Sequence, residues 1–215
     1  MKYHWQQFLR RPIIAVALLS LVAIDSAAAE TVRLSTFIDN PFSQLAARII
    51  TEAYRRAGFD AEILYLPGKR ALLMSSDGDV DGEVSRVFAI GELYPSLIRV
   101  NVPYMTLRGL AFAINKDVHV KQRSHLANYR IGSLRGAVFS DQLTEGFDGI
   151  HAANPHQLLK MLVFGRVDVI VTNEIETRVN IAKHFPDAGI SALFPPLIET
   201  PIYHCIHKSR FNLVK

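Results

Sequence analysis

One short pattern occurs twice in this chain and constrains its fold more than any other feature: Gly78-Asp-Val-Asp81 and Gly165-Arg-Val-Asp168. Each copy follows a Leu-rich stretch with helical spacing and precedes an apolar stretch typical of a buried parallel strand. A glycine after a helix supplies the left-handed residue that ends it. The repeat therefore predicts two similar helix-turn-strand units, and hence two α/β lobes with a cleft between them.

The segment around the first copy alternates strands and helices. Asn40-Pro41 begins a helix, because Asn accepts hydrogen bonds from the first free N–H groups and Pro at the first helical position loses none. A β-α-β-α-β series predicts a parallel sheet with right-handed crossovers. The predicted strands are 31–36, 61–66 and 82–87, and the predicted helices are 40–58 and 68–76.

The second half repeats this alternation after an apolar strand at 109–115, which we interpret as the crossing to the second lobe. Its predicted strands are 129–133, a short one near 150, and 167–172, and its predicted helices are 138–144, 154–165 and 174–184. A strand at 202–207 is expected to return the chain to the first lobe. We therefore expect a signal peptide at 1–29, lobe 1 at 30–108, lobe 2 at 109–199 and a return segment at 200–215.

Residues 1–29 have the pattern of a cleaved export signal. Lys2, Arg10 and Arg11 precede an apolar stretch of about twelve residues, shorter than the roughly twenty that cross a bilayer. Small residues at 27–29 then provide a cleavage site. Without this segment the net charge falls from +4 to +2, so nucleic acid is a poor candidate partner. We expect a periplasmic protein, cleaved near Ala29, that is a monomer.

The chain contains, in this order, an export signal, an aromatic-rich loop at 36–42, Gly78-x-x-Asp81, Pro103-Tyr104, the segment 126–136, Leu158-Leu159 and Gly165-x-x-Asp168. This series resembles the extracytoplasmic solute-binding proteins of ABC importers, in particular the family that binds polar amino acids, in which the motifs have the same order. The resemblance implies two doubly wound lobes joined by a hinge, the type II periplasmic binding protein fold. It also implies ligand capture by hinge closure, with an ABC permease or a membrane sensor as partner.

Three departures from the family's pattern concern the ligand. In its amino-acid binders, an aspartate at the position of Asn173 takes the ammonium group, a hydroxyl residue stands at the position of Ala137, and an arginine stands at that of Leu93. These departures argue against an ordinary α-amino acid as the ligand. The family also ends with one or two helices that pack on lobe 1, whereas this chain stops at Arg210–Lys215, so we expect those helices to be missing.

Counting five residues from each repeated aspartate gives Arg86 in one lobe and Asn173 in the other, and both are predicted to lie at the cleft walls. The fork of donors on Arg86 suits a carboxylate or phosphate, and its alternative role is a surface ion pair with Glu83 or Glu92. The alternative role of Asn173 is to cap the helix that follows it. Arg70 and Arg135, each before a helix, are further candidate anion contacts with solvent exposure as the alternative.

Three aromatic residues, Phe37, Phe42 and Tyr104, are candidate walls for a ligand, with packing in the core as the alternative. The histidines have no supporting pattern of metal ligands, and the sequence predicts no metal or cofactor. Cys205 is the only cysteine, and we interpret it as a core residue rather than a nucleophile.

The sequence thus supports a binding protein for a small polar, anionic solute. The alternative is an enzyme on the same scaffold that dehydrates a small carboxylic acid, as a few proteins resembling this family do. That reaction would require a cleft carboxylate with a raised pKa, for which Glu83 and Glu174 are the candidates.

Overall fold

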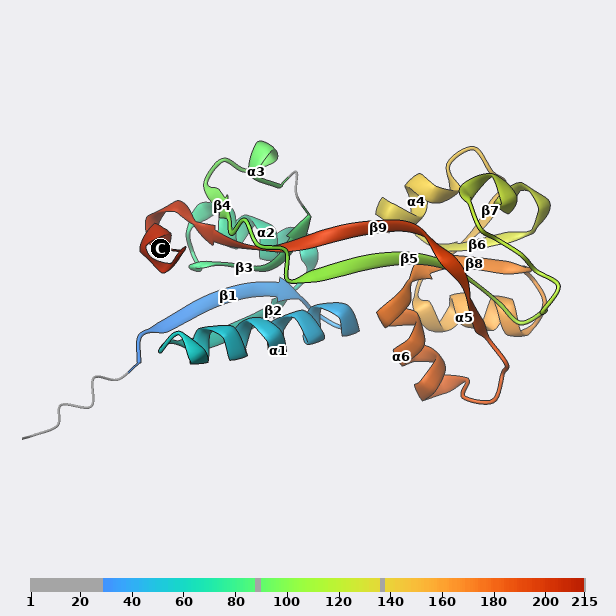
Figure 1. Cartoon of the computed structure of the whole chain (residues 1–215), viewed down its shortest axis with the longest axis horizontal. Helices are drawn as coiled ribbons and strands as arrows, with labels where there is room; N and C mark the ends of the chain where they lie inside the picture. Colours follow the sequence, from blue (N-terminus) through green and yellow to red (C-terminus); the bar gives the residue numbers. More distant parts are fainter. Residues whose placement is uncertain (1–28, 88–89, 136–137, 215) are drawn as a thin grey trace, which may run out of the picture.

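The computed structural model describes residues 29–87, 90–135 and 138–214, which form two α/β lobes (Figure 1). One sheet runs through both lobes, with the strand order β2-β1-β3-β9-β5-β8-β6-β7, and β4 pairs with β9. Two long neighbouring strands, β5 (Met105–Ala113) and β9 (Ser191–His207), link the lobes. The predicted two-lobe α/β fold is confirmed.

Lobe 1 has the predicted parallel series, because β1 pairs in parallel with both β2 and β3. The side chain of Asn40 caps the first helix by accepting a hydrogen bond from the Ser43 N–H at 3.0 Å. The elements are β1 (Thr31–Phe37), α1 (Pro41–Arg56), β2 (Asp60–Leu66), α2 (Gly68–Asp77), β3 (Gly82–Val87), α3 (Ile90–Leu93) and β4 (Leu97–Arg99).

Lobe 2 repeats the arrangement, with β6 between β7 and β8 and parallel to both. Asn154 caps its middle helix through the Gln157 N–H at 2.9 Å, as Asn40 does in lobe 1. The elements are a 3₁₀ helix η1 (Arg123–Asn128), β6 (Ile131–Leu134), α4 (Val138–Thr144), β7 (Gly149–Ala152), α5 (Pro155–Val163), β8 (Val169–Asn173) and α6 (Glu174–His184).

Both linking strands begin earlier than the sequence predicts, β5 at Met105 instead of 109 and β9 at Ser191 instead of 202. Pro195 and Pro196 obscure the beginning of β9, since proline lacks the N–H that a strand interior needs. The structure accommodates them at a shift in register between the pairs Ala111–Leu193 and Gly109–Ile198. The expected lobe boundaries at 108/109 and 199/200 lie inside these paired strands, where Arg108 is opposite Glu199.

The repeated pattern builds the same turn in both lobes. Gly78 and Gly165 have positive φ angles of 85° and 65°, the conformation that favours glycine. Asp81 donates its N–H to the Arg33 carbonyl at 2.8 Å and accepts the Arg33 N–H at 2.7 Å. Asp168 forms the same pair of bonds with Arg130, at 2.8 and 2.9 Å. Each aspartate therefore fixes the start of a neighbouring strand, as its position before a strand indicates.

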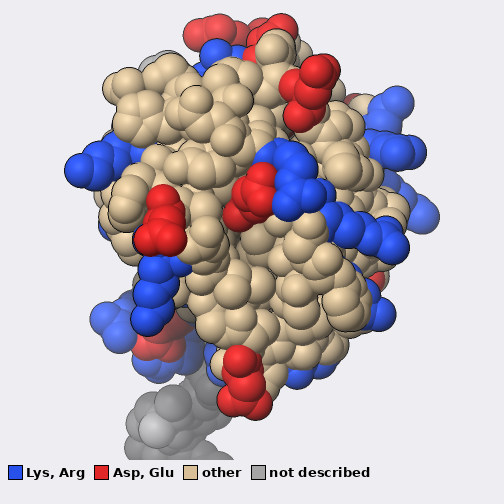
Figure 2. Space-filling view, turned by 90° about the vertical axis from the view of Figure 1, so that its right-hand side faces the viewer, with Lys and Arg blue, Asp and Glu red and all other residues tan. Residues whose placement is uncertain are grey.

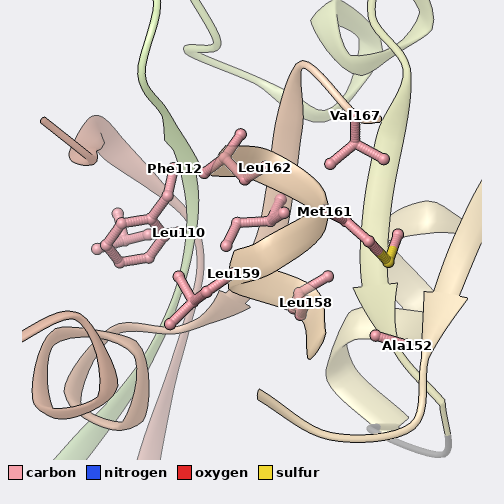
Figure 3. Packing of buried hydrophobic residues seen from close by; sticks show 9 residues of the cluster. Leu110, Phe112, Ala152, Leu158, Leu159, Met161, Leu162 and Val167 are labelled. Carbon is pink, nitrogen blue, oxygen red and sulfur yellow. The ribbon is translucent and has the colours of Figure 1, made fainter. Parts of the chain in front are cut away.

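The linking strands also complete the cores. On β5, Leu110 and Phe112 pack against α5, as Figure 3 shows, while Ala111 and Ala113 face the opposite layer. This alternation explains why the central strands of lobe 2 are apolar on both faces. On β9, Ile206 packs with residues of β1, α1 and β3 in the core of lobe 1. The chain then forms a 3₁₀ helix, η2 (Lys208–Val214), whose Leu213 packs against that core.

Candidate functional site

Strand direction brings the carboxyl ends of both sheets toward each other. β5 runs from lobe 1 into lobe 2, and β9 returns antiparallel to it. Because β3 is antiparallel to β9, β3 and its parallel neighbour β1 also run toward lobe 2. β8 is antiparallel to β5, so β8 and β6 run toward lobe 1 (Figure 1). We call the carboxyl ends of β1 and β3, and of β6 and β8, the interlobe edges.

Arg86 lies near the end of β3 at the interlobe edge of lobe 1. Its guanidinium forms an ion pair with the carboxylate of Glu83, which lies on the same strand. The pairing with Glu83 that the sequence offered as the alternative role is therefore observed. It is internal rather than at the surface, since Glu83 is fully buried and the Arg86 side chain is 14% exposed. The Nε atom of Arg86 is buried and has no hydrogen-bond partner in the described part of the chain. One donor of the fork thus has no partner among the described residues, and it is enclosed.

Opposing effects act on the pKa of the buried Glu83 carboxyl. Burial raises the pKa of its carboxyl, while the adjacent Arg86 charge and the Ser75 hydroxyl lower it. Ser75, in α2, donates a hydrogen bond to Oε2 at 3.2 Å. A carboxylate that is enclosed and paired in this way is not exposed to a substrate.

Phe37 supports the guanidinium of Arg86. The Arg86 Cζ atom lies 4.7 Å from the centre of the Phe37 ring, within the range of a cation–π contact. The Phe37 ring also packs so closely on Gly68 that a Cβ on Gly68 would lie 2.7 Å from Cε1 of the ring. Phe37 and Arg86 are therefore brought together, on two neighbouring strands, as one contiguous group.

The other two predicted aromatic residues have internal roles. Phe42, in the first turn of α1, is only 6% exposed. Tyr104 packs against the core of lobe 1, and its hydroxyl donates to the Val84 carbonyl at 2.9 Å. Burial raises the pKa of Tyr104 above its ordinary value. Both residues fit the packing alternative, and a ligand contact by either one stays a prediction.

The remaining predicted cations are solvent-exposed. Arg70 lies in the first turn of α2, and Arg135 directly follows β6 at the interlobe edge of lobe 2. Neither guanidinium forms an ion pair with any residue that the structure describes. The glycine and alanine after Arg135, at 136–137, lie outside the described residues. Both arginines thus match the solvent-exposed alternative, and anion binding by them stays a prediction.

On lobe 2, Asn173 is the last residue of β8 and is 4% exposed. Its Oδ1 accepts the Glu176 N–H at 3.0 Å, so the capping role that the sequence offered as an alternative is observed. The cap uses the oxygen of the amide. Asn173 therefore positions the N-terminus of α6 at the interlobe edge.

A charged cluster next to this cap was missed from sequence. Arg108 of β5 forms ion pairs with Glu174 at 3.5 Å and with Glu199 at 2.9 Å, and Arg178 bonds Glu174 at 2.9 Å. The only sequence signal was the i, i+4 spacing of Glu174 and Arg178. Pairing across β5 and β9 could not be seen without their register. Glu174 is thus an ion-paired residue where two strands link the lobes.

Two hollows on the described surface lie away from the interlobe edges. One, of about 450 Å³, is at the far end of lobe 2 and is lined by Ile114, Tyr129, Val167 and neighbours. Another, of about 570 Å³, lies beside α4. Figure 2 shows the end of lobe 2, where charges of both signs are scattered and form no continuous basic surface. Within the described residues, no three His, Cys, Asp or Glu side chains are grouped to hold a metal ion.

Solved structures share this architecture over most of their length. The arginine-bound ArgBP from T. maritima aligns with 86% of this chain and 91% of its own, with a TM-score of 0.61 and 14% identity. The chain has the type II periplasmic binding protein fold. An ancestral arginine-binding protein bound to arginine has the same fold, with a TM-score of 0.63, 16% identity and coverage of 86% and 87%. The periplasmic VFT2 domain of Bordetella pertussis BvgS matches with a TM-score of 0.61, 17% identity and coverage of 86% and 83%.

Sequence comparison adds one relative. A protein of Shewanella oneidensis, described as uncharacterized, is 24% identical over 178 residues, which cover 79% of this chain and 67% of the relative. No protein-family model matches the sequence. The structural neighbours are arginine-binding proteins and a periplasmic VFT2 domain, so the type II periplasmic binding protein fold is what these comparisons establish.

Proposed function

We propose that this protein binds a small polar, anionic solute between its lobes by hinge closure. The observation that carries the proposal is Arg86, whose largely buried guanidinium lies at the interlobe edge and has one donor, Nε, without a partner among the described residues. Ligands of open α/β sheets bind beyond the carboxyl ends of the strands, which is where this group lies. Phe37 beneath the guanidinium provides an aromatic wall, and Arg70, Arg135, Phe42, Tyr104 and Asn173 are the further predicted contacts.

The proposed hinge lies where β5 and β9 cross from one lobe to the other. Lobe 1 at 30–108 and lobe 2 at 109–199 would close as rigid bodies, with small backbone changes near the Arg108–Glu199 pair. Closure would let residues of lobe 2, Asn173 among them, contact a solute held on lobe 1. Small-angle scattering should show a smaller radius of gyration with the solute than without it.

Binding is proposed rather than catalysis. The dehydratase alternative needs an accessible carboxylate with a raised pKa, but Glu83 is fully buried and paired with Arg86. Glu174 is shared by two arginines. Neither carboxylate is poised to take a proton from a substrate.

We also propose that the mature protein is exported, and acts with an ABC permease or a membrane sensor. The fold's neighbours include arginine-binding proteins and a periplasmic VFT2 domain. In the described residues no helix has the length and apolarity to span a bilayer. The N-terminal sequence of the protein recovered from a periplasmic fraction should begin at Glu30, and an uncleaved N-terminus would contradict this.

The test of binding is a thermal-shift screen followed by calorimetry, with amino acids, organic acids and phosphorylated small molecules. A solute at a hundred times its Kd should stabilise the folded state by about 2.7 kcal/mol. The double variant Glu83→Gln/Arg86→Gln removes both charges of the buried pair and should abolish binding. The matched control is Glu52→Gln/Arg55→Gln, which removes an exposed Glu–Arg pair of the same spacing.

Two results would contradict the proposal. One is a screen in which no compound stabilises the protein. The other is a solute that binds the Glu83→Gln/Arg86→Gln variant as tightly as it binds the control, because a solute held by the Arg86 guanidinium should lose its affinity when that group is removed.

A further inference from the structure

The guanidinium that we assign to the solute already has an internal anion. Glu83 is fully buried, and its carboxylate forms an ion pair with Arg86. A solute anion at Arg86 would therefore meet a cation whose charge is shared. Because both anions need the same guanidinium, their interactions with it oppose each other in a low-dielectric site.

We propose that a bound anion competes with Glu83 for Arg86, and that Glu83 takes up a proton when the anion binds. This inference rests on the proposed function, since it concerns the same site. When the guanidinium turns to an external anion, the buried carboxylate loses its compensating charge. An uncompensated buried carboxylate is costly, and protonation is the usual response.

Arg86 supplies the positive charge beside Glu83, because the other groups that surround this carboxylate are neutral. From α2, the Ser75 hydroxyl donates to the carboxylate at 3.2 Å, and that group is neutral. From β9, Cys205 is paired with Glu83 in register, and the Nδ1 of His204 donates to the Glu83 carbonyl at 2.9 Å. From β1, Ser35 is opposite Glu83 in register.

The two titratable neighbours on β9 do not change charge near neutral pH. Burial raises the pKa of the Cys205 thiol to about 12, so it stays protonated. Burial lowers the pKa of His204 to about 4, so its imidazole stays neutral. Among the groups that surround Glu83, the protonation state that binding can change between pH 5 and 8 is therefore that of Glu83 itself.

The sign of the resulting pH dependence follows from linkage. If binding takes up a proton, the affinity for the anion rises as pH falls, by up to about tenfold per pH unit for one proton. Replacing Glu83 by Gln removes the competing anion. Glu83→Gln should therefore bind anions more tightly than the wild type at pH 8, and its affinity should not vary with pH.

The experiment uses sulfate as the probe, because its charge is constant between pH 5 and 8. Calorimetry gives its Kd at intervals across this range for the wild type, Glu83→Gln and the control Glu52→Gln, whose carboxylate is paired on the surface of α1. We expect the wild-type and control Kd to rise with pH and the Glu83→Gln Kd to stay constant and lower at pH 8. In two buffers of different ionisation enthalpy, the wild type should show proton uptake on binding.

The opposite outcomes are distinct. A wild-type Kd that is constant with pH, no proton uptake, or no sulfate binding at any pH overturns the inference. So does weaker binding by Glu83→Gln with the wild-type pH profile, which is what a purely structural role would give. If Glu83→Gln does not fold, the proton uptake of the wild type decides the question. A solute found in the screen that binds without proton uptake would leave the proposed function intact and overturn this inference alone.

Discussion

Removing the Arg86 guanidinium should destabilise the fold through the carboxylate that it leaves behind. In Arg86→Ala, Glu83 stays in a site with no exposed surface and loses its ion-pair partner. Breaking a buried pair by removing one partner typically costs about 3–5 kcal/mol, whereas removing both is often close to neutral. We therefore expect a loss of about 3–5 kcal/mol in the free energy of unfolding for Arg86→Ala. Glu83→Gln/Arg86→Gln should regain most of it.

The loss should also depend on pH in a defined direction. Without Arg86, burial raises the pKa of Glu83 in the folded state with little to oppose it. An acid with a raised folded pKa destabilises the folded state most above that pKa, and this penalty shrinks as pH falls from the folded pKa toward the lower pKa of the unfolded chain. The difference between wild type and Arg86→Ala should thus shrink from pH 8 to pH 5.

Urea denaturation of residues 30–215 measures the free energy of unfolding of each variant. Far-ultraviolet circular dichroism is the signal, because the single tryptophan, Trp5, precedes this segment and cannot report on it by fluorescence. The control Arg55→Ala removes one of the two exposed arginine partners of Glu52 and should leave the midpoint unchanged. If Arg86→Ala is as stable as this control at pH 8, or if the double variant is no more stable than Arg86→Ala, the description of a buried, mutually dependent pair is wrong.

Two further predictions concern the contact of β3 with β9. In Gly82→Ala the new Cβ would lie 2.3 Å from the Cys205 carbonyl oxygen, a backbone atom that cannot move aside, so we expect the cooperative unfolding transition to be lost. Gly149→Ala, in a strand where the nearest atom is 3.5 Å away, should keep it, and equal melting curves would contradict the prediction. Burial lowers the pKa of His204 to about 4, below its ordinary value of 6.5, so protonation favours the unfolded chain. Stability should fall by about 3 kcal/mol more in the wild type than in His204→Gln as pH drops from 6.5 to 4, and parallel pH profiles would refute this.

Much of the secondary structure could be predicted because its signals are local. Asn40-Pro41 and Asn154-Pro155 mark helix starts. Gly78 and Gly165 mark the points after a helix where the backbone adopts the left-handed conformation, and both have positive φ angles in the structure. These signals depend on the conformations that one residue permits. The full length of β9 could not be predicted in the same way, because two prolines interrupt it and its pairing partners are distant in sequence.

The candidate site was predictable in position more than in role. Counting from the repeated aspartates put Arg86 and Asn173 at the ends of β3 and β8, where the structure has them. The cap that Asn173 forms on α6 was one of the two roles that the sequence offered for it. The position of Arg86 over Phe37 was not predicted, because it depends on which strands are neighbours. The Arg108 cluster was not predicted, since only strand register brings Arg108 beside Glu174 and Glu199.

By itself, the sequence determined the order of helices and strands and the existence of two similar lobes. Those properties follow from residue-by-residue conformational preferences and from the spacing of apolar side chains, which act within one element. The tertiary structure alone decided that Glu83 is enclosed against Arg86 and that Tyr104 bonds Val84. Burial and charge compensation depend on which strands lie side by side, and that arrangement is set by packing between segments far apart in the chain.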